Sequence, residues 1–167
     1  MKKTLMAGMA SLFIGITLLS CEKTKESTVR IRMTDAPAAY EEVNVDLKQV
    51  NIKFDNDTTS WMSMNTRAGI YNLLALQNGI DTLIADGTFP SGTIKEIRLV
   101  LGENNTIKEG GNTLPLTIPS GATSGLKIKV NKKLRATTEE LLIDFDALLS
   151  VRKEADGYKL RPVIKLK

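Results

Sequence analysis

The all-β character of this chain is clearest in residues 43–54, which read Val-Asn-Val-Asp-Leu-Lys-Gln-Val-Asn-Ile-Lys-Phe. Apolar and polar residues alternate as far as Leu47, which is the period-two pattern of a half-buried strand. The apolar phase then slips by one residue and continues from Val50 to Phe54. Such a slip turns a strand inside out unless an extra residue is accommodated. We therefore predict a β-bulge near Lys48-Gln49, which keeps one face apolar.

Short strand patterns of the same kind continue on both sides of this segment. They are separated by Gly, Pro, Asn or Asp and recur in residues 29–33, 61–64, 82–85, 97–101, 106–108, 114–116, 126–130, 141–145, 151–152 and 158–166. Residues 71–76 fit either a strand end or one helical turn, and residues 147–149 fit a half turn of helix. About eight to ten strands at this spacing predict one domain, a single antiparallel β-sandwich of the prealbumin or Ig-like kind. We expect residues 61–64 to pair with residues 43–54, and Pro115 to lie on an edge strand.

The first twenty residues are not expected to belong to this domain. Met1-Lys2-Lys3 is a basic start, and residues 4–19 form an almost unbroken apolar run without charge, as in a secretory signal peptide. The run has 16 residues, fewer than the ~20 that a membrane-spanning helix needs. It closes with Leu18-Leu19-Ser20-Cys21, which resembles a bacterial lipobox and would place a diacylglycerol on Cys21. The alternative is an ordinary signal peptide with an incidental cysteine.

Lipidation would define three segments of the chain. A diacylglycerol on Cys21, with a fatty acid such as palmitate on the new amine, would anchor the protein stably in a membrane. We then expect residues 1–20 to be a removed lipoprotein signal peptide, 21–28 to be the lipidated cysteine and a polar tether, and 29–167 to be the sandwich. The expected location is the outer membrane. Glu22 and Glu26 fit a surface-export signal only loosely, so display on the cell surface and a periplasm-facing orientation both stay open.

Composition excludes several classes of activity. The chain of 167 residues has one cysteine and no histidine, so it lacks internal disulfides, His-dependent nucleophile triads and His metal ligands. Loss of Lys2 and Lys3 would lower the formal net charge from +4 to +2, so the high isoelectric point is not a nucleic-acid signal. The basic residues of segment 127–135 alternate with apolar ones, as on the solvated face of a strand. We expect no nucleic-acid partner, no cofactor and no enzymatic activity.

Carboxylates offer a candidate metal site. Asp144 and Asp146 are two residues apart, so both would lie on one face of a strand, opposite the apolar residues between and beside them. With Asp35 or Glu140 nearby they could bind calcium, which takes several oxygen ligands. The alternative interpretation is a solvated strand face on which Lys or Arg side chains of the next strand pair with these carboxylates.

Aromatic side chains offer a candidate ligand-binding surface. Trp61, Tyr40, Tyr71 and Tyr158 could stack on sugar rings if they were exposed together, although single aromatic residues more often belong to a core or its rim. Two further stretches fit a short O-glycosylation pattern, Asp57-Thr58-Thr59 and Asp81-Thr82-Leu83. The aromatic group therefore predicts a sugar platform only if folding brings its members to one face.

Several short motifs, taken in order, resemble domain-of-unknown-function family 4382 of bacteria. They are Met33-Thr34-Asp35-Ala36-Pro37, the Trp61 strand, Leu73-Leu74 with Asn78-Gly79, Phe89-Pro90-Ser91-Gly92 before Ile97-Arg98-Leu99, Leu142-Ile143-Asp144-Phe145-Asp146-Ala147, Ser150-Val151 and Leu160-Arg161-Pro162-Val163-Ile164. The likeness covers residues 28–167, and the Pro-Ser-Gly turn also resembles prealbumin-like surface modules. The resemblance implies a lipoprotein or secreted protein, and it implies no activity.

These observations together favour a binding role in the cell envelope. We expect a non-enzymatic, lipid-anchored protein that binds a glycan or a protein partner. One alternative is a structural or adhesin-assembly subunit, in which strand edges pair with other chains. Another alternative is a calcium-dependent surface module built on the carboxylates.

Overall fold

Strands dominate the structure, as the alternation of apolar and polar residues predicts. The computed structural model describes residues 25–55, 60–119 and 125–167. The expected leader, the lipidation site Cys21 and the Asp57-Thr58-Thr59 motif lie outside these residues. The described elements are β1 (Glu26–Thr34), β2 (Glu42–Phe54), β3 (Met62–Ser63), β4 (Asn65–Thr66), β5 (Gly69–Asn72), η1 (Leu73–Leu76), β6 (Thr82–Pro90), β7 (Thr93–Leu101), β8 (Thr106–Glu109), β9 (Asn112–Thr117), β10 (Leu126–Lys133), β11 (Thr138–Phe145), α1 (Ala147–Ser150), β12 (Val151–Glu154), β13 (Gly157–Leu160) and β14 (Ile164–Leu166).

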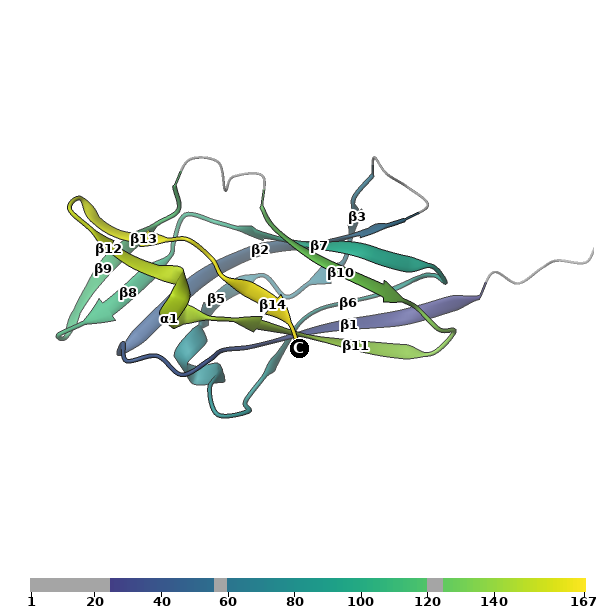
Figure 1. Cartoon of the computed structure of the whole chain (residues 1–167), viewed down its shortest axis with the longest axis horizontal. Coiled ribbons are helices and arrows are strands. Elements are labelled where there is room, and N and C mark those ends of the chain that lie inside the picture. Colours follow the sequence, from purple (N-terminus) through teal and green to yellow (C-terminus); the bar gives the residue numbers. More distant parts are fainter. Residues whose placement is uncertain (1–24, 56–59, 120–124) are drawn as a thin grey trace, which may run out of the picture.

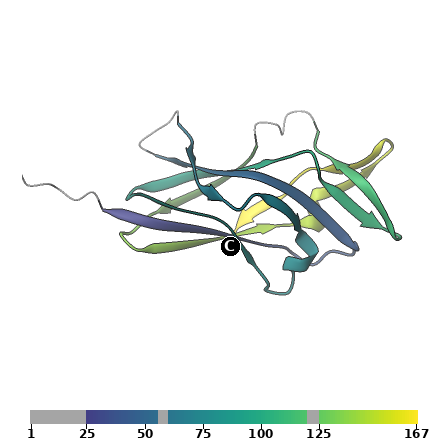
Figure 2. The same ribbon diagram turned by 180° about the vertical axis from the view of Figure 1, so that it is seen from behind.

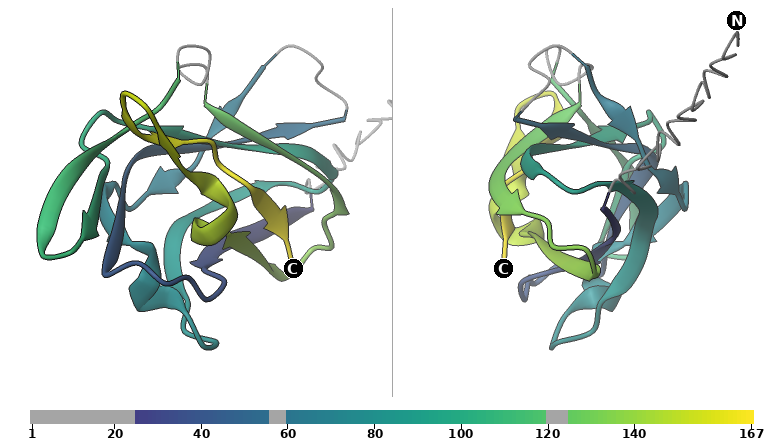
Figure 3. Two further views of the ribbon diagram at one scale, coloured as in Figure 1. Left: turned by 60° about the vertical axis from the view of Figure 1, so that its left-hand side comes forward. Right: turned by 90° about the vertical axis from the view of Figure 1, so that its right-hand side faces the viewer.

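The strands form two sheets that pack as a sandwich, which confirms the predicted fold class (Figures 1 and 3). One sheet has five strands in the order β14-β11-β1-β6-β4, and the other has nine, in the order β10-β7-β2-β8-β9-β13-β12 with β3 and β5 also paired to β2. Figure 2 shows β2 running along most of the length of the sandwich. The strand β1 begins at the end of the molecule opposite the β8–β9 and β12–β13 hairpins (Figures 1 and 2).

The expectation of purely antiparallel sheets was wrong. The pairs β1–β11 and β9–β13 are parallel, so both sheets are mixed. Parallel neighbours need long crossover connections, and a hairpin pattern along the chain carries no sign of them. The described residues also hold more strands than the eight to ten expected. One reason is that β3 and β4 have only two residues each; another is that the segment 158–166 breaks into β13 and β14 around Pro162, which has no N–H for a ladder.

The central strand β2 contains the predicted bulge. Its register against β7 shifts between Leu47 and Gln49, and Leu47 and Val50 on either side are both buried. One extra residue therefore keeps the apolar side chains on the inner face, as the phase slip required. The predicted pairing of β3 with β2 is also confirmed, with Asn51 opposite Ser63.

One strand boundary and one strand position differ from the predictions. The first strand begins at Glu26 instead of residue 29, and Ser27 is buried with its hydroxyl donating to the Arg135 carbonyl, so residues 26–28 belong to the sandwich and not to a tether. Pro115 was expected on an edge, but β9 lies between β8 and β13. Its position is tolerated because β13 pairs only with Leu116 and Thr117, which leaves Pro115 without a ladder partner on that side.

The core lies between the two sheets and is built from the alternating apolar positions. Fully buried side chains include Ile31, Met33, Leu47, Ile52, Leu73, Ile84, Ile94, Ile97, Leu99, Ile107, Leu116 and Phe145. The ambiguous segment 71–76 divides into the end of β5 and the single turn η1, in which the Asn72 side chain accepts a hydrogen bond from the Leu74 N–H. Because the apolar side chains of β2, β7 and β10 point into the core, the polar residues between them form the outer face of the larger sheet.

Candidate functional site

Trp61 lies across the outer face of the larger sheet. It immediately precedes β3, which pairs with one side of β2, whereas Arg98 belongs to β7 on the other side of β2. The Arg98 Cζ atom is 4.5 Å from the centre of the indole ring, and the Lys53 Nζ atom is 5.8 Å from it. Both distances fall within the range of cation–π attraction. The half-buried ring is therefore held on the sheet by two cations while part of it stays open to solvent.

We define the Trp61 face as Trp61 together with the outward side chains around it, which are Asn51, Lys53, Glu96, Arg98, Lys127 and Lys129. A cavity of about 440 Å³ adjoins this face at the end of β2. It is lined by Lys53, Phe54, Asp55, Lys95, Glu96, Lys129 and Asn131. Its size falls in the range of small-molecule sites. Lys53 belongs to the cavity and also contacts Trp61, so the aromatic ring and the cavity form one continuous surface.

Arg98 is enclosed between Trp61 and the start of β10. A Cβ atom added to Gly125 would lie 2.8 Å from Arg98 Cγ, so the glycine gives room for the arginine stem. The Arg98 Nε atom is buried and has no hydrogen-bond partner among the described residues. The guanidinium group is therefore positioned by packing against Trp61 and Gly125.

A pair of glycines tests whether this packing is tight. Gly125 and Gly79 both have φ of +84°, but a Cβ added to Gly79 would meet nothing within 4 Å. Gly79→Ala should cost about 1–2 kcal/mol of unfolding free energy, from the left-handed backbone alone. Gly125→Ala should cost at least about 1 kcal/mol more, because the methyl group overpacks the Arg98 stem and the Leu99 carbonyl. Urea denaturation measures both, and equal losses would contradict the tight packing.

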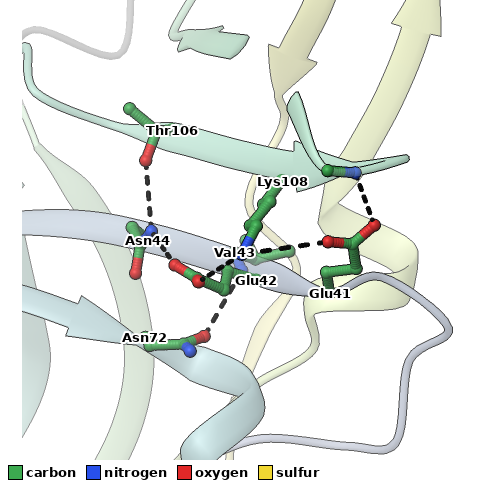
Figure 4. Close-up of polar contacts among 8 residues, drawn as sticks. Glu41, Glu42, Val43, Asn44, Asn72, Thr106 and Lys108 are labelled. Atoms are coloured by element: carbon green, nitrogen blue, oxygen red, sulfur yellow. Dashed lines mark hydrogen bonds and ion pairs between the residues drawn. The ribbon is translucent and has the colours of Figure 1, made fainter. Parts of the chain in front are cut away.

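The polar residues at the other end of β2 form a closed network instead (Figure 4). Lys108 Nζ lies 3.5 Å from a Glu42 oxygen and 3.9 Å from a Glu41 oxygen. The Asn44 amide donates to Glu42 at 3.1 Å and to the Thr106 hydroxyl at 3.2 Å. These donors also hold the pKa of Glu42 below its usual value, the Asn44 hydrogen bond first among them. Lys108 is therefore paired with two carboxylates, whereas the cations of the Trp61 face have no such partners among the described residues.

The four aromatic candidates do not come together. Tyr158 is buried on β13, where its hydroxyl donates to Glu109 and lowers the pKa of that carboxyl. Tyr40 packs against the core before β2. Tyr71 lies on β5, and its hydroxyl donates to the Arg67 carbonyl at 2.5 Å. Only Trp61 lies on the Trp61 face, so the condition for a shared sugar platform is not met. The tyrosines lie in different parts of the sandwich, at the core or its rim, as single aromatic residues more often do.

The carboxylates proposed as calcium ligands make structural contacts. Asp35 is 3% exposed; its Oδ1 accepts the Ala147 N–H at 2.8 Å, and its Oδ2 accepts from the Gln77 amide at 3.2 Å. Asp146 caps α1 by accepting the Leu149 N–H. Burial raises the Asp35 pKa to about 6, against the opposing effect of these hydrogen bonds. Asp35 and Asp146 therefore join the ends of β1, η1 and β11.

Asp144 lies apart from this pair in its contacts. It was expected on a solvated face, but its side chain is 2% exposed, and its Oδ2 lies 3.2 Å from Lys165 Nζ and 3.4 Å from Lys167 Nζ. Lysine partners on the next strand were correctly anticipated, since Lys165 is directly opposite on β14. The expected solvation was wrong, because the Asp144 carboxylate is buried beside the lysines of the chain's last strand and its end. Glu140 is exposed and pairs with Arg30, and the described residues contain no group of three or more metal-ligating side chains.

The edge strand β10 of the larger sheet bears on the alternative in which strand edges pair with other chains. This strand contains four lysines, Lys127, Lys129, Lys132 and Lys133. Its register against β7 shifts between Lys129 and Lys132. Lysines and bulges on an edge strand discourage addition of another strand.

The second O-glycosylation motif lies elsewhere, with Asp81 paired to Arg32 and Thr82 half-buried at the start of β6.

Part of this site was visible in the sequence. Trp61 was a candidate, but Lys53 and Arg98 were assigned no role, and Lys127 and Lys129 were interpreted only as a solvated strand face. The alternation of basic residues on three strands could be seen in the sequence. The sequence does not show that these three strands are neighbours in one sheet. In the part of the chain that the structure describes, no helix is long and apolar enough to cross a membrane.

Comparison with known protein families matches residues 26–162 to DUF4382, a domain of unknown function. No curated protein and no solved structure matches the chain.

Proposed function

The chain belongs to the DUF4382 family, whose description assigns no function, so we propose its role from its own sequence and structure. We propose that the protein is a non-enzymatic, lipid-anchored protein of the bacterial outer membrane that binds a glycan on the Trp61 face. The observation that carries this proposal is the indole ring held across β2 by Arg98 and Lys53. The lipobox-like sequence ending at Cys21 supports the anchor.

The geometry of the face suits a sugar ligand. Aromatic rings contribute a large contact area with little conformational entropy to lose, and their stacking surface accepts any apolar ring face. The adjoining cavity of about 440 Å³ supplies polar groups from Glu96, Asn131 and the lysines beside the apolar Phe54 ring. A sugar stacked on Trp61 could therefore be oriented by hydrogen bonds from the cavity rim.

The residues best suited to acid–base chemistry have other roles, which supports a binding function over catalysis. The chain contains no histidine. The one described carboxyl group with a strongly raised pKa, Asp35, is held by the Ala147 N–H and Gln77 and lies away from the Trp61 face. Catalytic acids and bases need access to substrate as well as a shifted pKa. Measurable hydrolysis of glycans by the pure protein would contradict this part of the proposal.

Replacement of Trp61 tests the proposed site. We expect a panel of oligosaccharides to contain at least one that binds the purified chain, and Trp61→Ala to weaken that binding by at least about tenfold, since buried aromatic anchors dominate interface energetics. Isothermal titration calorimetry measures the affinities. The matched control is Ile80→Ala, which removes an exposed apolar side chain from the loop after η1. Equal affinities for Trp61→Ala and Ile80→Ala, both folded by circular dichroism, would refute the site.

A further inference from the structure

The cations of the Trp61 face are stacked in adjacent positions on three strands. Arg98 lies directly opposite Lys127 of β10 and opposite Asn51 of β2. One row further along, Glu96 lies between Lys53 and Lys129. Like charges directly opposite each other on neighbouring strands are destabilising. The Arg98–Lys127 pair is therefore a cost to folding that neighbouring side chains do little to reduce.

These cations lack the partners that other surface cations have. Elsewhere Lys132 pairs with Glu139 at 3.1 Å, Lys153 with Glu109 at 3.3 Å and Arg161 with Glu154 at 2.9 Å. Among the described residues, no carboxylate lies within 4 Å of the charged nitrogens of Lys53, Arg98, Lys127 or Lys129. Of the described residues, Glu96 is the one acid on the Trp61 face itself and Asp55 lies at the adjoining cavity, so the four cations leave this face with an excess of positive charge.

Arg98 is the best oriented of these groups. Its stem is confined by Gly125, its guanidinium lies against the Trp61 ring, and its Nε is buried without an acceptor. A guanidinium held in place loses little entropy when it binds a carboxylate, sulfate or phosphate, and its planar donors match those oxyanions. An anion at this position would also relieve the repulsion between Arg98 and Lys127.

We infer that the glycan bound by the Trp61 face is acidic, with a sugar ring on Trp61 and its carboxylate or other oxyanion held by Arg98 and Lys127. This inference rests on the proposed function and names the ligand class of the same site. It differs from nonspecific attraction to a basic surface, because one arginine in a defined position next to the aromatic ring carries the recognition.

The test compares one sugar with and without its charge. Oligogalacturonate and its neutral methyl ester have the same rings, and Trp61, the single tryptophan of the chain, reports binding by its fluorescence. We expect the acidic oligomer to bind at least about tenfold more tightly than the ester at low salt, with an advantage that shrinks as salt screens the charges. Arg98→Gln should remove most of the advantage of the acidic oligomer, so that the ratio of the two affinities approaches one, whatever the substitution does to both ligands through the Trp61 ring.

A charge-matched control separates local recognition from net charge. Arg30→Gln removes one positive charge from β1 in the other sheet, where Arg30 pairs with Glu140, and it should leave both affinities unchanged. Equal weakening by Arg98→Gln and Arg30→Gln would overturn the inference. Equal affinities for acid and ester that both depend on Trp61 would overturn the inference and leave the proposed glycan function standing. Absence of binding by both oligomers and by the wider oligosaccharide panel would overturn both.

Discussion

Replacing Phe145 with alanine should lower the free energy of unfolding by about 3–5 kcal/mol. Phe145 has no exposed surface and is the largest of the fully buried side chains. It lies at the end of β11, opposite Ile164 of β14. Removing the ring loses the transfer free energy of its buried atoms. The two close-packed sheets relax only partly into the space that the ring leaves, so the remaining cavity adds to the loss.

Urea denaturation followed by Trp61 fluorescence measures this effect. Leu142→Ala is the control on the same strand, because Leu142 is half-buried and alternates with the buried Leu141 and Ile143. It should lose less than half as much stability as Phe145→Ala. A loss below about 1 kcal/mol for Phe145→Ala, the usual cost of a modest surface or rim change, would contradict the packing of β11 against the opposite sheet.

The second large effect is the dependence of stability on pH through Asp35. Burial raises its folded-state pKa from 3.8 to about 6, although the hydrogen bonds from Ala147 and Gln77 oppose the shift. The protonated form is therefore favoured by folding. Protonated Asp35 therefore contributes fully to the free energy of unfolding below the unfolded-state pKa near 4. This contribution is lost as the pH rises through the folded-state pKa of about 6. Two pKa units correspond to about 3 kcal/mol.

Asp35→Asn isolates this contribution, because asparagine does not titrate. The difference in unfolding free energy between the wild type and Asp35→Asn should move by about 2.5 kcal/mol in favour of the variant between pH 4 and pH 7.5, since a small part of the full effect is already lost at pH 4. Asp156→Asn is the control of opposite sign: Lys159 lowers the pKa of Asp156 by a hydrogen bond, so the wild type should gain on this variant as the pH rises. Denaturation series at several pH values measure both. A pH-independent difference for Asp35→Asn would contradict the raised pKa.

Local patterns were enough to predict the strands, the bulge and several turns. The bulge at Lys48-Gln49 follows from a phase slip within one strand, and the Gly110-Gly111 turn follows from two residues that adopt φ of +58° and +76°. The half turn expected at 147–149 is α1, which begins after its cap Asp146. Each of these features depends on residues within a few positions of one another, so the information is present in the chain itself.

The assignments that failed concern faces covered by distant elements. Asp144 alternates correctly with Ile143 and Phe145, yet it is buried, and Lys165 of β14 and the following Lys167 both lie against its carboxylate. Asp35 follows β1 and becomes buried because η1 and α1 close over it. A period-two pattern separates the two faces of a strand, but it does not say which other segment lies over either face.

The sequence by itself determined that this protein is a β-sandwich, because alternation and turn residues are local features, and the lipobox-like stretch that ends at Cys21 stays a prediction. Only the tertiary structure decided that β1 pairs in parallel with β11 and that Trp61 lies against Arg98 across β2. Both contacts join residues far apart in the chain. They are selected by how two whole sheets bury their apolar faces together, and a local pattern carries no record of that choice.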